Sequence, residues 1–328
     1  MFETLILIFA SGLAASFLAL PVIIEKMRKA GIVGADVHKK GRPIVPEMGG
    51  IAVLIGLAVS VTVAILIMPE ESALLLSFLA TTLIAGVIGA IDDWKTLSAK
   101  MKPFLTIFAG APILLMRTYA PFLVLPIIGQ TRLTIVYPLI VPLAIAVSSN
   151  AVNMMDPFNG TMSGTCTIVT LALVASALLL GHNDALILCL SLLGPLLAFY
   201  YFNRYPSKVF SGDVGSLTIG AALGAIALLG RLEAVAVVAF MPQIMNAFYG
   251  LGTVGRLYER REVSRPITIL EDGKLKANSD PKAPITLARL VLARGPLHEH
   301  EAIRVLLVFS AISGALAIFT AYLMLVIP

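Results

Sequence analysis

Long apolar segments recur from one end of this chain to the other, each close to the length that crosses a bilayer. A membrane-spanning helix needs about 20 mostly apolar residues. Ten candidate segments can be distinguished, at 2–24, 49–68, 73–91, 103–121, 135–149, 161–180, 184–202, 214–230, 233–250 and 304–326. Charged residues make up only 13% of the chain, against roughly a quarter in soluble domains. The sequence therefore predicts an all-α integral membrane protein with about ten transmembrane helices, folded as a single domain over residues 1–328.

The basic residues predict how these helices are oriented. Loops on the cytoplasmic side of a membrane are enriched in Lys and Arg. If the N-terminus lies outside, the inside segments are 25–48, 92–102, 150–160, 203–213 and 251–303. Together with Arg304 they hold 21 of the 24 Lys and Arg residues. We therefore expect a plasma-membrane protein with both termini outside and these five segments on the cytoplasmic face.

The net charge of +5 belongs mostly to these inside segments. Because the basic residues lie between spans, we expect them to face the lipid bilayer, and we expect no nucleic-acid partner. The two cysteines, Cys166 and Cys189, lie within apolar segments. This placement indicates neither a disulfide framework nor a zinc site.

The long inside segment 251–303 contains one local structural signal. Between residues 266 and 276, Asp272-Gly273 forms a strong turn signal within an alternating pattern, which is typical of a short β-hairpin. We expect no separately folding soluble domain in this segment.

Acidic residues are almost absent from the interior of the spans, and Glu3 and Glu233 lie at outer helix ends. Transporters usually carry ionisable groups at membrane depth. Here the polar groups gather where helices leave the membrane on one side. This pattern favours an enzyme at the inner interface, where a lipid head group can meet a soluble substrate.

Paired carboxylates mark the first of four candidate site segments. Asp92 and Asp93 end an apolar segment, and Lys102 follows shortly after. Two adjacent carboxylates could hold a divalent cation or supply a base. A solvated helix end is the alternative, and for this pair taken alone it is the more frequent case.

Amide and carboxylate side chains mark the second segment, which has no basic residue. It contains Asn150, Asn153, Asp156 and Asn159. These side chains offer oxygen ligands for a metal and amide donors for a substrate. A tight turn with helix capping is the alternative.

The third and fourth segments carry groups suited to phosphates. Asn203 begins the third, and Asp213 stands at the start of an apolar helix, where backbone N–H groups favour anions. An Asp helix cap is the alternative for Asp213. In the fourth, His298 and His300 are two residues apart and so do not share one helix face; an interfacial polar segment is the alternative.

These segments resemble those of the polyprenyl-phosphate N-acetylhexosamine-1-phosphate transferase superfamily. The likeness extends from Pro46-Glu47-Met48-Gly49-Gly50 to His298 and is most specific between Asn203 and Asp213. It is strongest toward the UDP-GlcNAc:dolichyl-phosphate GlcNAc-1-phosphate transferases. Val214-Gly215-Ser216-Leu217 and Asp156 look more bacterial, and the mixture suggests an archaeal enzyme. Two departures from the bacterial motifs are Glu299 between two histidines and Pro157 in place of glycine.

The resemblance implies ten spans, dependence on Mg²⁺ or Mn²⁺, and release of UMP. It implies metal ligation by Asn153 and Asp213 and catalytic roles for Asp92, Asp93 and Lys102. It also implies that a further set binds substrate, with Asn159 at the uracil and the histidines near the diphosphate or sugar. That set is Glu47, Asn150, Asp156, Asn159, Asn203, His298 and His300.

The expected reaction transfers GlcNAc-1-phosphate from UDP-GlcNAc to a dolichyl or other polyprenyl phosphate, as the first step of lipid-linked glycan assembly. Either a direct attack by the lipid phosphate or a two-step route through an aspartyl intermediate would produce it. A phospho-N-acetylmuramoyl-pentapeptide-type transferase is the first alternative, and a lipid-linked sugar transporter is the second. The resemblance also makes a homodimer plausible.

Overall fold

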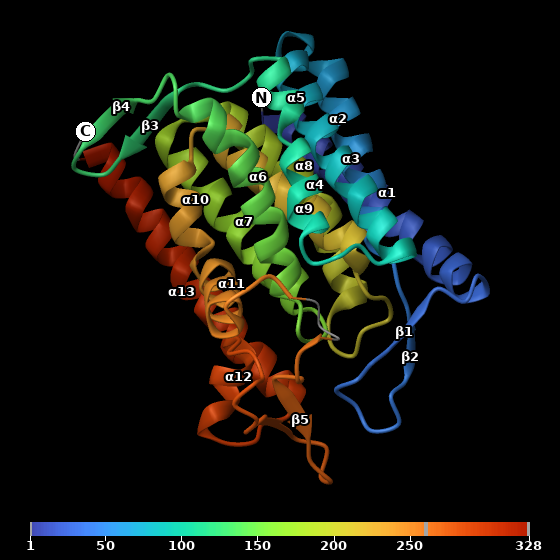
Figure 1. The fold of residues 1–328 in the computed structure, drawn as a ribbon. Coiled ribbons are helices and arrows are strands. Elements are labelled where there is room, and N and C mark those ends of the chain that lie inside the picture. Colours follow the sequence, from blue (N-terminus) through green and yellow to red (C-terminus); the bar gives the residue numbers. More distant parts are fainter. Residues whose placement is uncertain (1, 259–261, 327–328) are drawn as a thin grey trace.

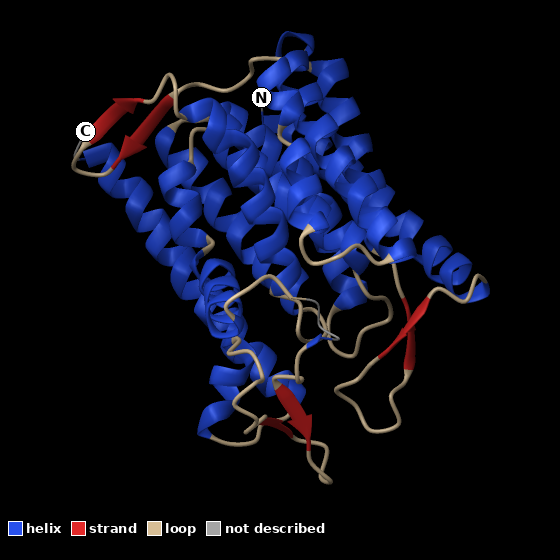
Figure 2. Ribbon diagram, in the orientation of Figure 1, coloured by secondary structure: helices blue, strands red, loops and turns tan. Residues whose placement is uncertain are grey.

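The computed structural model describes residues 2–258 and 262–326, and within them the chain is predominantly helical (Figures 1 and 2). The helices are α1 Phe2–Lys29, α2 Gly50–Ile67, α3 Ser72–Lys95, α4 Met101–Phe108, α5 Ala111–Leu115, α6 Tyr137–Met154, α7 Thr161–Leu180, α8 Asn183–Asn203, α9 Gly212–Leu229, α10 Glu233–Ala239, α11 Met241–Val254, α12 Leu287–Val291 and α13 Glu299–Val326, with short 3-10 turns at Pro69–Glu71 and Leu292–Arg294.

Within the described residues, eight helices are long and apolar enough to cross a membrane. A ninth is counted if α10 and α11, which meet at a 65° bend, form one broken span. Apolar side chains cover much of the outer surface of the bundle, as a lipid environment requires. The prediction of an all-α, multi-pass membrane protein is therefore confirmed.

The expected fourth span, 103–121, differs from the structure. It forms two short helices, α4 and α5, which are separated at Ala109 and Gly110. Pro112 lies in the first turn of α5, and Gly110 packs so closely on Pro142 of α6 that a Cβ there would lie 2.7 Å from the Pro142 Cα. The fifth candidate remains continuous as α6. Pro138 lies in its first turn, where a missing N–H costs nothing, and Pro142 lies inside the helix without breaking it.

The N-terminal end of α1 and the C-terminal end of α13 lie at the same end of the bundle, where the strands β3 Phe122–Leu125 and β4 Gly129–Arg132 also lie (Figure 1). At the opposite end lie the end of α1, the strands β1 Val33–Ala35 and β2 Ile44–Pro46, and the segment that contains α12. We call this second end the polar end, since α3, α6 and α8 also finish there and α2, α7, α9 and α13 begin there.

The hairpin expected at 266–276 is confirmed. Strands β5 Ile267–Ile269 and β6 Leu275–Ala277 pair antiparallel, with Ile269 opposite Leu275. Gly273 has a φ of 85° in the turn, a conformation that glycine adopts without strain. The hairpins β1–β2 and β3–β4 were not expected from the sequence. Residues 259–261 of the predicted long loop lie outside the described residues.

Helix α9 occupies the centre of the bundle, and its side chains from Val214 to Leu229 are buried. It packs against α2, α3, α6 and α8. Small residues allow the closest of these approaches, because a Cβ on Gly50 would lie 2.0 Å from the Cα of Gly215, and one on Gly89 would lie 2.4 Å from the carbonyl oxygen of Asp213. The first turn of α9 is therefore held tightly at the polar end.

Candidate functional site

Four helices bring five polar side chains together at the polar end. Asp92 and Asp93 come from the end of α3, Lys102 from α4, Asn153 from the end of α6 and Asp213 from the first turn of α9. We call this set the acidic centre: Asp92, Asp93, Lys102, Asn153 and Asp213. These residues are far apart in the sequence, and each reaches the cluster because its helix begins or ends there.

Asp213 contacts three other members of the acidic centre, two through its side chain and one through its backbone. One of its carboxylate oxygens accepts a hydrogen bond from the Lys102 ammonium at 2.7 Å. The other accepts one from the side-chain amide of Asn153. That amide also donates to the Ser216 hydroxyl at 2.9 Å, one turn along α9. The Asp213 side chain is thereby fixed from two sides.

Asp93 binds the backbone at the start of α9. Its two oxygens accept hydrogen bonds from the backbone N–H groups of Asp213, at 2.7 Å, and Val214, at 3.0 Å. A carboxylate suits these N–H groups, because they have no partner within the helix and lie at the positive end of the helix dipole. Asp93 therefore caps α9 from α3 and sets the position of Asp213.

Asp92 faces Lys102. It is buried, one of its oxygens forms an ion pair with the Lys102 ammonium, and the other accepts a hydrogen bond from the backbone N–H of Leu97. Lys102 thus bridges Asp92 and Asp213. Of the two adjacent aspartates, Asp92 has one oxygen on a cationic side chain, whereas both oxygens of Asp93 accept from backbone N–H groups.

Glu47 lies beside the acidic centre, immediately after β2. Burial raises its pKa above the ordinary value, and the negative charge of Asp213 raises it further. The segment after Glu47 is tied to the entrance of α9, because the N–H of Gly49 donates to the carbonyl of Phe210 and that of Gly50 to the carbonyl of Ser211, at 2.8 and 2.9 Å. Asp156 joins the same entrance by accepting a hydrogen bond from the Ser211 hydroxyl at 2.8 Å.

Asn150 lies about one turn deeper in α6 than Asn153. Its side-chain amide donates to the Thr106 hydroxyl of α4 at 2.9 Å and to the carbonyl of Ala146 at 2.8 Å. One N–H of that amide therefore joins α6 to α4, and the other donates to a carbonyl of α6 itself, so both are used within the protein. This geometry favours a positioning role over the predicted contact with substrate.

Asn203 is also used internally. It is buried, donates to the carbonyl of Val209 at 2.9 Å and accepts from the Ser163 hydroxyl at 2.6 Å. These bonds hold the segment between α8 and α9 in place. Its predicted substrate contact would therefore be indirect, through the shape of that segment.

A second cluster surrounds Asn159 at the start of α7. The Asn159 side chain donates to Asp36 at 3.0 Å, and its backbone N–H donates to Glu299 at 3.1 Å. Asp36 also forms an ion pair with Lys39 at 2.6 Å. Burial raises the pKa of Asp36, but hydrogen bonds from Lys39 and Asn159 and the Lys39 charge outweigh it, so the pKa lies below the ordinary 3.8.

The two histidines lie on the rim of this second cluster. Their rings stack with centroids 5.6 Å apart, and the His300 ring lies 6.0 Å from that of Tyr205. His300, Asn159 and Tyr205 line a pocket of about 410 Å³, whose wall also contains Arg204 and Arg304. Within the described chain, no hydrogen bond or ion pair joins either imidazole to the acidic centre.

Three residues of the second cluster were not assigned to the site from the sequence: Asp36, Lys39 and Glu299, the last noted only as a departure from the bacterial motif. Asp36 is only 3% exposed and Glu299 only 5%. The one available signal was an acid followed three residues later by a lysine, which does not distinguish a buried pair from a solvated loop. The Glu299 carboxylate retains one buried oxygen without a hydrogen-bond partner among the described residues.

The donor chemistry of the acidic centre fits Mg²⁺. No cluster of three His, Cys, Asp or Glu side chains suited to a metal occurs among the described residues. Mg²⁺ usually binds through one or two protein carboxylates, with waters and substrate phosphates completing its shell. Asp92 and Asp213 provide two such carboxylates on either side of one cation, the Lys102 ammonium. Asn153 could add its amide oxygen.

Comparison with known proteins identifies related sequences. Residues 75–231 match the sequence model of a family described as Glycosyl transferase family 4. That segment runs from α3 to the residues just after α9 and contains the whole acidic centre.

Individual relatives match a larger share of the chain than the family model does. A protein of Methanocaldococcus jannaschii provisionally named as a glycosyltransferase is 33% identical, over 87% of this chain and 86% of its own. One of Saccharolobus solfataricus, provisionally named UDP-N-acetylglucosamine–dolichyl-phosphate N-acetylglucosaminephosphotransferase, is 26% identical over 92% of each chain. The phospho-N-acetylmuramoyl-pentapeptide-transferase of Shouchella clausii is 30% identical, over 70% of this chain and 76% of its own.

Proposed function

Because the chain belongs to glycosyl transferase family 4, we propose that it transfers N-acetylglucosamine-1-phosphate from UDP-N-acetylglucosamine to a dolichyl or other polyprenyl phosphate. The observation that carries this proposal is the convergence of the acidic centre at one end of a membrane bundle. A soluble nucleotide sugar and a lipid phosphate can meet only where a protein opens to both water and bilayer. The name of the relative from S. solfataricus supports the choice of sugar and lipid.

The proposed orientation places the polar end at the cytoplasmic face of the plasma membrane. The strong enrichment of Lys and Arg in segments of that end supports it, because such residues favour the cytoplasmic side. The start of α1 and the end of α13 both lie at the end of the bundle opposite the polar end (Figure 1). This placement requires an even number of membrane crossings, which results when α4 and α5 are counted together as one crossing.

In the proposed reaction, an oxygen of the lipid phosphate attacks the β-phosphorus of the nucleotide sugar. The bond from that phosphorus to the bridging oxygen breaks, UMP leaves with the bridging oxygen, and a polyprenyl-diphosphate sugar forms. Asp213 is aimed and held by Lys102, Asn153 and the cap from Asp93. Such fixed charges and dipoles supply much of the rate in phosphoryl transfer.

A divalent cation held by Asp213, with Asp92 and Asn153 nearby, would neutralise the diphosphate and ease departure of UMP. Lys102 lies where its ammonium can move from the carboxylates to a phosphate oxygen when substrate arrives. Once Lys102 has moved, the Asp92 oxygen that it now contacts can accept a proton from the acceptor phosphate, or act as the nucleophile of a two-step route. A phospho-sugar trapped covalently on Asp92 would establish two steps.

The same chemistry suits a second candidate substrate. The similarity to the transferase of S. clausii favours UDP-N-acetylmuramoyl-pentapeptide as the alternative donor. The two share the diphosphate and differ in the sugar, so the acidic centre does not distinguish them. The pocket beside His300 and Asn159 lies outside that centre and is where a larger sugar would be accommodated.

The test is an assay of the purified full-length chain with polyprenyl phosphate, Mg²⁺ and each UDP-sugar in turn, with UMP as the product measured. UMP release with UDP-N-acetylglucosamine and a matching lipid-linked product would support the proposal. Release only with the muramoyl-pentapeptide donor would select the alternative. No release with any donor, from protein shown to be folded, would refute transferase activity and leave lipid-linked sugar transport to be tested.

A further inference from the structure

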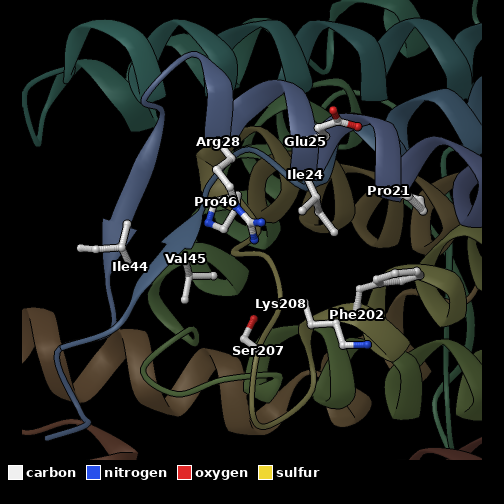
Figure 3. A pocket seen from close by; sticks show the side chains of 10 residues that line it. All are labelled: Pro21, Ile24, Glu25, Arg28, Ile44, Val45, Pro46, Phe202, Ser207 and Lys208. Atoms are coloured by element: carbon white, nitrogen blue, oxygen red, sulfur yellow. The ribbon is translucent and has the colours of Figure 1, made fainter. Parts of the chain in front are cut away.

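A second pocket at the polar end lies away from the acidic centre, between α1, β2 and the end of α8. It has a volume of about 490 Å³ and is lined by Pro21, Ile24, Glu25, Arg28, Ile44, Val45, Pro46, Phe202, Ser207 and Lys208. Figure 3 shows Arg28 reaching from α1 toward the space above Val45, with Phe202 and Lys208 on the opposite side. We call it the α1–α8 pocket.

The pocket combines an apolar wall with two exposed cations. Pro21, Ile24 and Phe202 supply apolar surface, and Arg28 and Lys208 come from opposite sides of the opening. Within the described residues neither cation forms an ion pair, whereas Glu25, the acid at the edge, is engaged with Lys29 at 2.6 Å. Two uncompensated positive charges over an apolar wall suit an anionic head group attached to hydrocarbon.

Aromatic side chains mark the depth of this pocket in the membrane. The Phe17, Tyr201 and Phe202 rings contact one another, with centroids 5.2 to 5.8 Å apart. The Lys208 ammonium lies 5.8 Å from the Tyr201 and Phe202 rings. Tyr and Trp side chains of this kind gather at the level of lipid head groups. Deeper along α1 than Arg28, Leu18 and Val22 are exposed, so acyl chains could continue along the surface of that helix.

We propose that the α1–α8 pocket binds the phosphodiester head group of an anionic membrane phospholipid. Basic pockets between transmembrane helices near the cytoplasmic side are a recurring form of such recognition. The occupant is a structural lipid and not the acceptor, since the acidic centre on α3, α4, α6 and α9 shares no residue with the pocket. Binding, unlike the proposed function, does not require turnover.

The bound lipid would steady the segment that leads to α9. Lys208 lies between Asn203, whose side chain holds the Val209 carbonyl, and Phe210, whose N–H donates to the carbonyl of Pro46 at 2.8 Å. Pro46 itself lines the pocket. A phosphate that joins Arg28 to Lys208 would therefore connect α1 to the short segment that ends at Ser211, immediately before α9.

The experiment measures binding of dioleoyl phosphatidylglycerol and dioleoyl phosphatidylcholine to the purified full-length chain by native mass spectrometry. The variant Arg28→Gln/Lys208→Gln removes both cations, and Lys26→Gln/Lys40→Gln removes the same charge from exposed positions outside the pocket. We expect the first variant to bind phosphatidylglycerol about tenfold more weakly, with the control and the binding of phosphatidylcholine unchanged.

Two results would overturn the proposal. Equal losses in both double variants would mean that overall surface charge, and not the pocket, attracts the lipid. Loss of polyprenyl-phosphate binding with phosphatidylglycerol binding intact would assign the pocket to the acceptor instead. The pair Arg28→Lys/Lys208→Arg keeps both charges and should bind as the unmodified chain does, which separates charge from damage to the fold. None of these results depends on whether the chain proves to be a transferase.

Discussion

The carboxylate of Asp93 accepts a hydrogen bond from the backbone N–H of Asp213, so one aspartate sets the position of another. The two residues lie on α3 and α9, and the second oxygen of Asp93 accepts from Val214. The adjacent residues Asp92 and Asp93 therefore have different roles. Asp93 supports the helix that presents Asp213, and Asp92 faces Lys102 inside the acidic centre.

Asp93→Ala should destabilise the chain. It leaves two N–H groups at the start of α9 without their partner, and loss of a helix cap costs about 1–2 kcal/mol. The measurement is unfolding by a denaturing detergent, followed by circular dichroism. Asp93→Asn retains one acceptor oxygen, so its stability should lie between those of the unmodified chain and Asp93→Ala. An Asp93→Ala variant as stable as the unmodified chain would contradict the capping role.

Asp213→Ala should reduce UMP release by roughly a thousandfold or more while the chain stays folded, because the side chain carries the charge around which the acidic centre is built. Glu70→Ala is the matched control, since Glu70 is an exposed acid just before α3, at the opposite end of that helix from Asp92. Thermal unfolding would establish that both variants are folded. Near-normal turnover in Asp213→Ala would refute its assignment as a metal ligand.

Lys102→Met should increase affinity for a divalent cation while lowering activity. The ammonium now lies against both Asp92 and Asp213, where it competes with a metal for the same oxygens. We expect Mn²⁺, followed by electron paramagnetic resonance, to bind on the order of tenfold more tightly to the variant. Lys95→Met is the control, because Lys95 is exposed at the end of α3. Weaker Mn²⁺ binding in Lys102→Met would show that the lysine organises the carboxylates instead of blocking them.

Acid should weaken the attachment of the β1–β2 hairpin. The pKa of Asp36 in the folded chain lies below its ordinary value of 3.8. Its ionised form therefore contributes stability above about pH 4, and that contribution is lost as the pH falls through the folded pKa. Asp36→Asn should lower the thermal midpoint near neutral pH. The difference in midpoint from the unmodified chain should narrow as the pH falls below about 4 and vanish below the folded pKa of Asp36. A gap independent of pH would exclude ionisation of Asp36 as the cause.

Gly50→Ala should disturb the crossing of α2 and α9. The added methyl would lie 2.0 Å from the Cα of Gly215, and relief of such a clash in a packed interior costs about 1–3 kcal/mol. Gly252→Ala is the control, since nothing lies within 4 Å of its Cβ position, also in a helix. Thermal unfolding of the two variants would compare them. Equal stability would mean that the helices can separate at Gly50 without cost.

The sequence predicted most of the membrane helices, because a long apolar segment is the main requirement for a span. The candidate at 233–250 forms two helices, α10 and α11, that meet at a 65° bend. The sequence predicted the hairpin of β5 and β6 from Asp272-Gly273. It did not predict the division of 103–121 into α4 and α5, which depends on the approach of Gly110 to Pro142. It gave no sign of the β1–β2 hairpin, whose strands are three residues each and are joined by an eight-residue connection.

Residue type predicted which side chains belong to the acidic centre better than it predicted what each side chain does there. The spacing of the motifs placed Asp92, Asn153 and Asp213 at helix ends on one side, and the structure brings them together. Sequence alone could not separate Asp92 from Asp93, because the difference lies in which one faces the α9 backbone. Nor could it find Asp36 and Glu299, which are buried by contacts with Asn159 more than a hundred residues away. The roles of all these residues remain predictions.

The central position of α9 has a consequence for the environments in which the chain can work. Bilayers of different thickness act on helices through the lipid that touches them. From Val214 onward α9 is covered by its neighbours, so a change in acyl-chain length would tilt the outer helices before it moved the one that carries Asp213. Transfer should therefore tolerate a range of membrane thicknesses better than the stability of the outer bundle does.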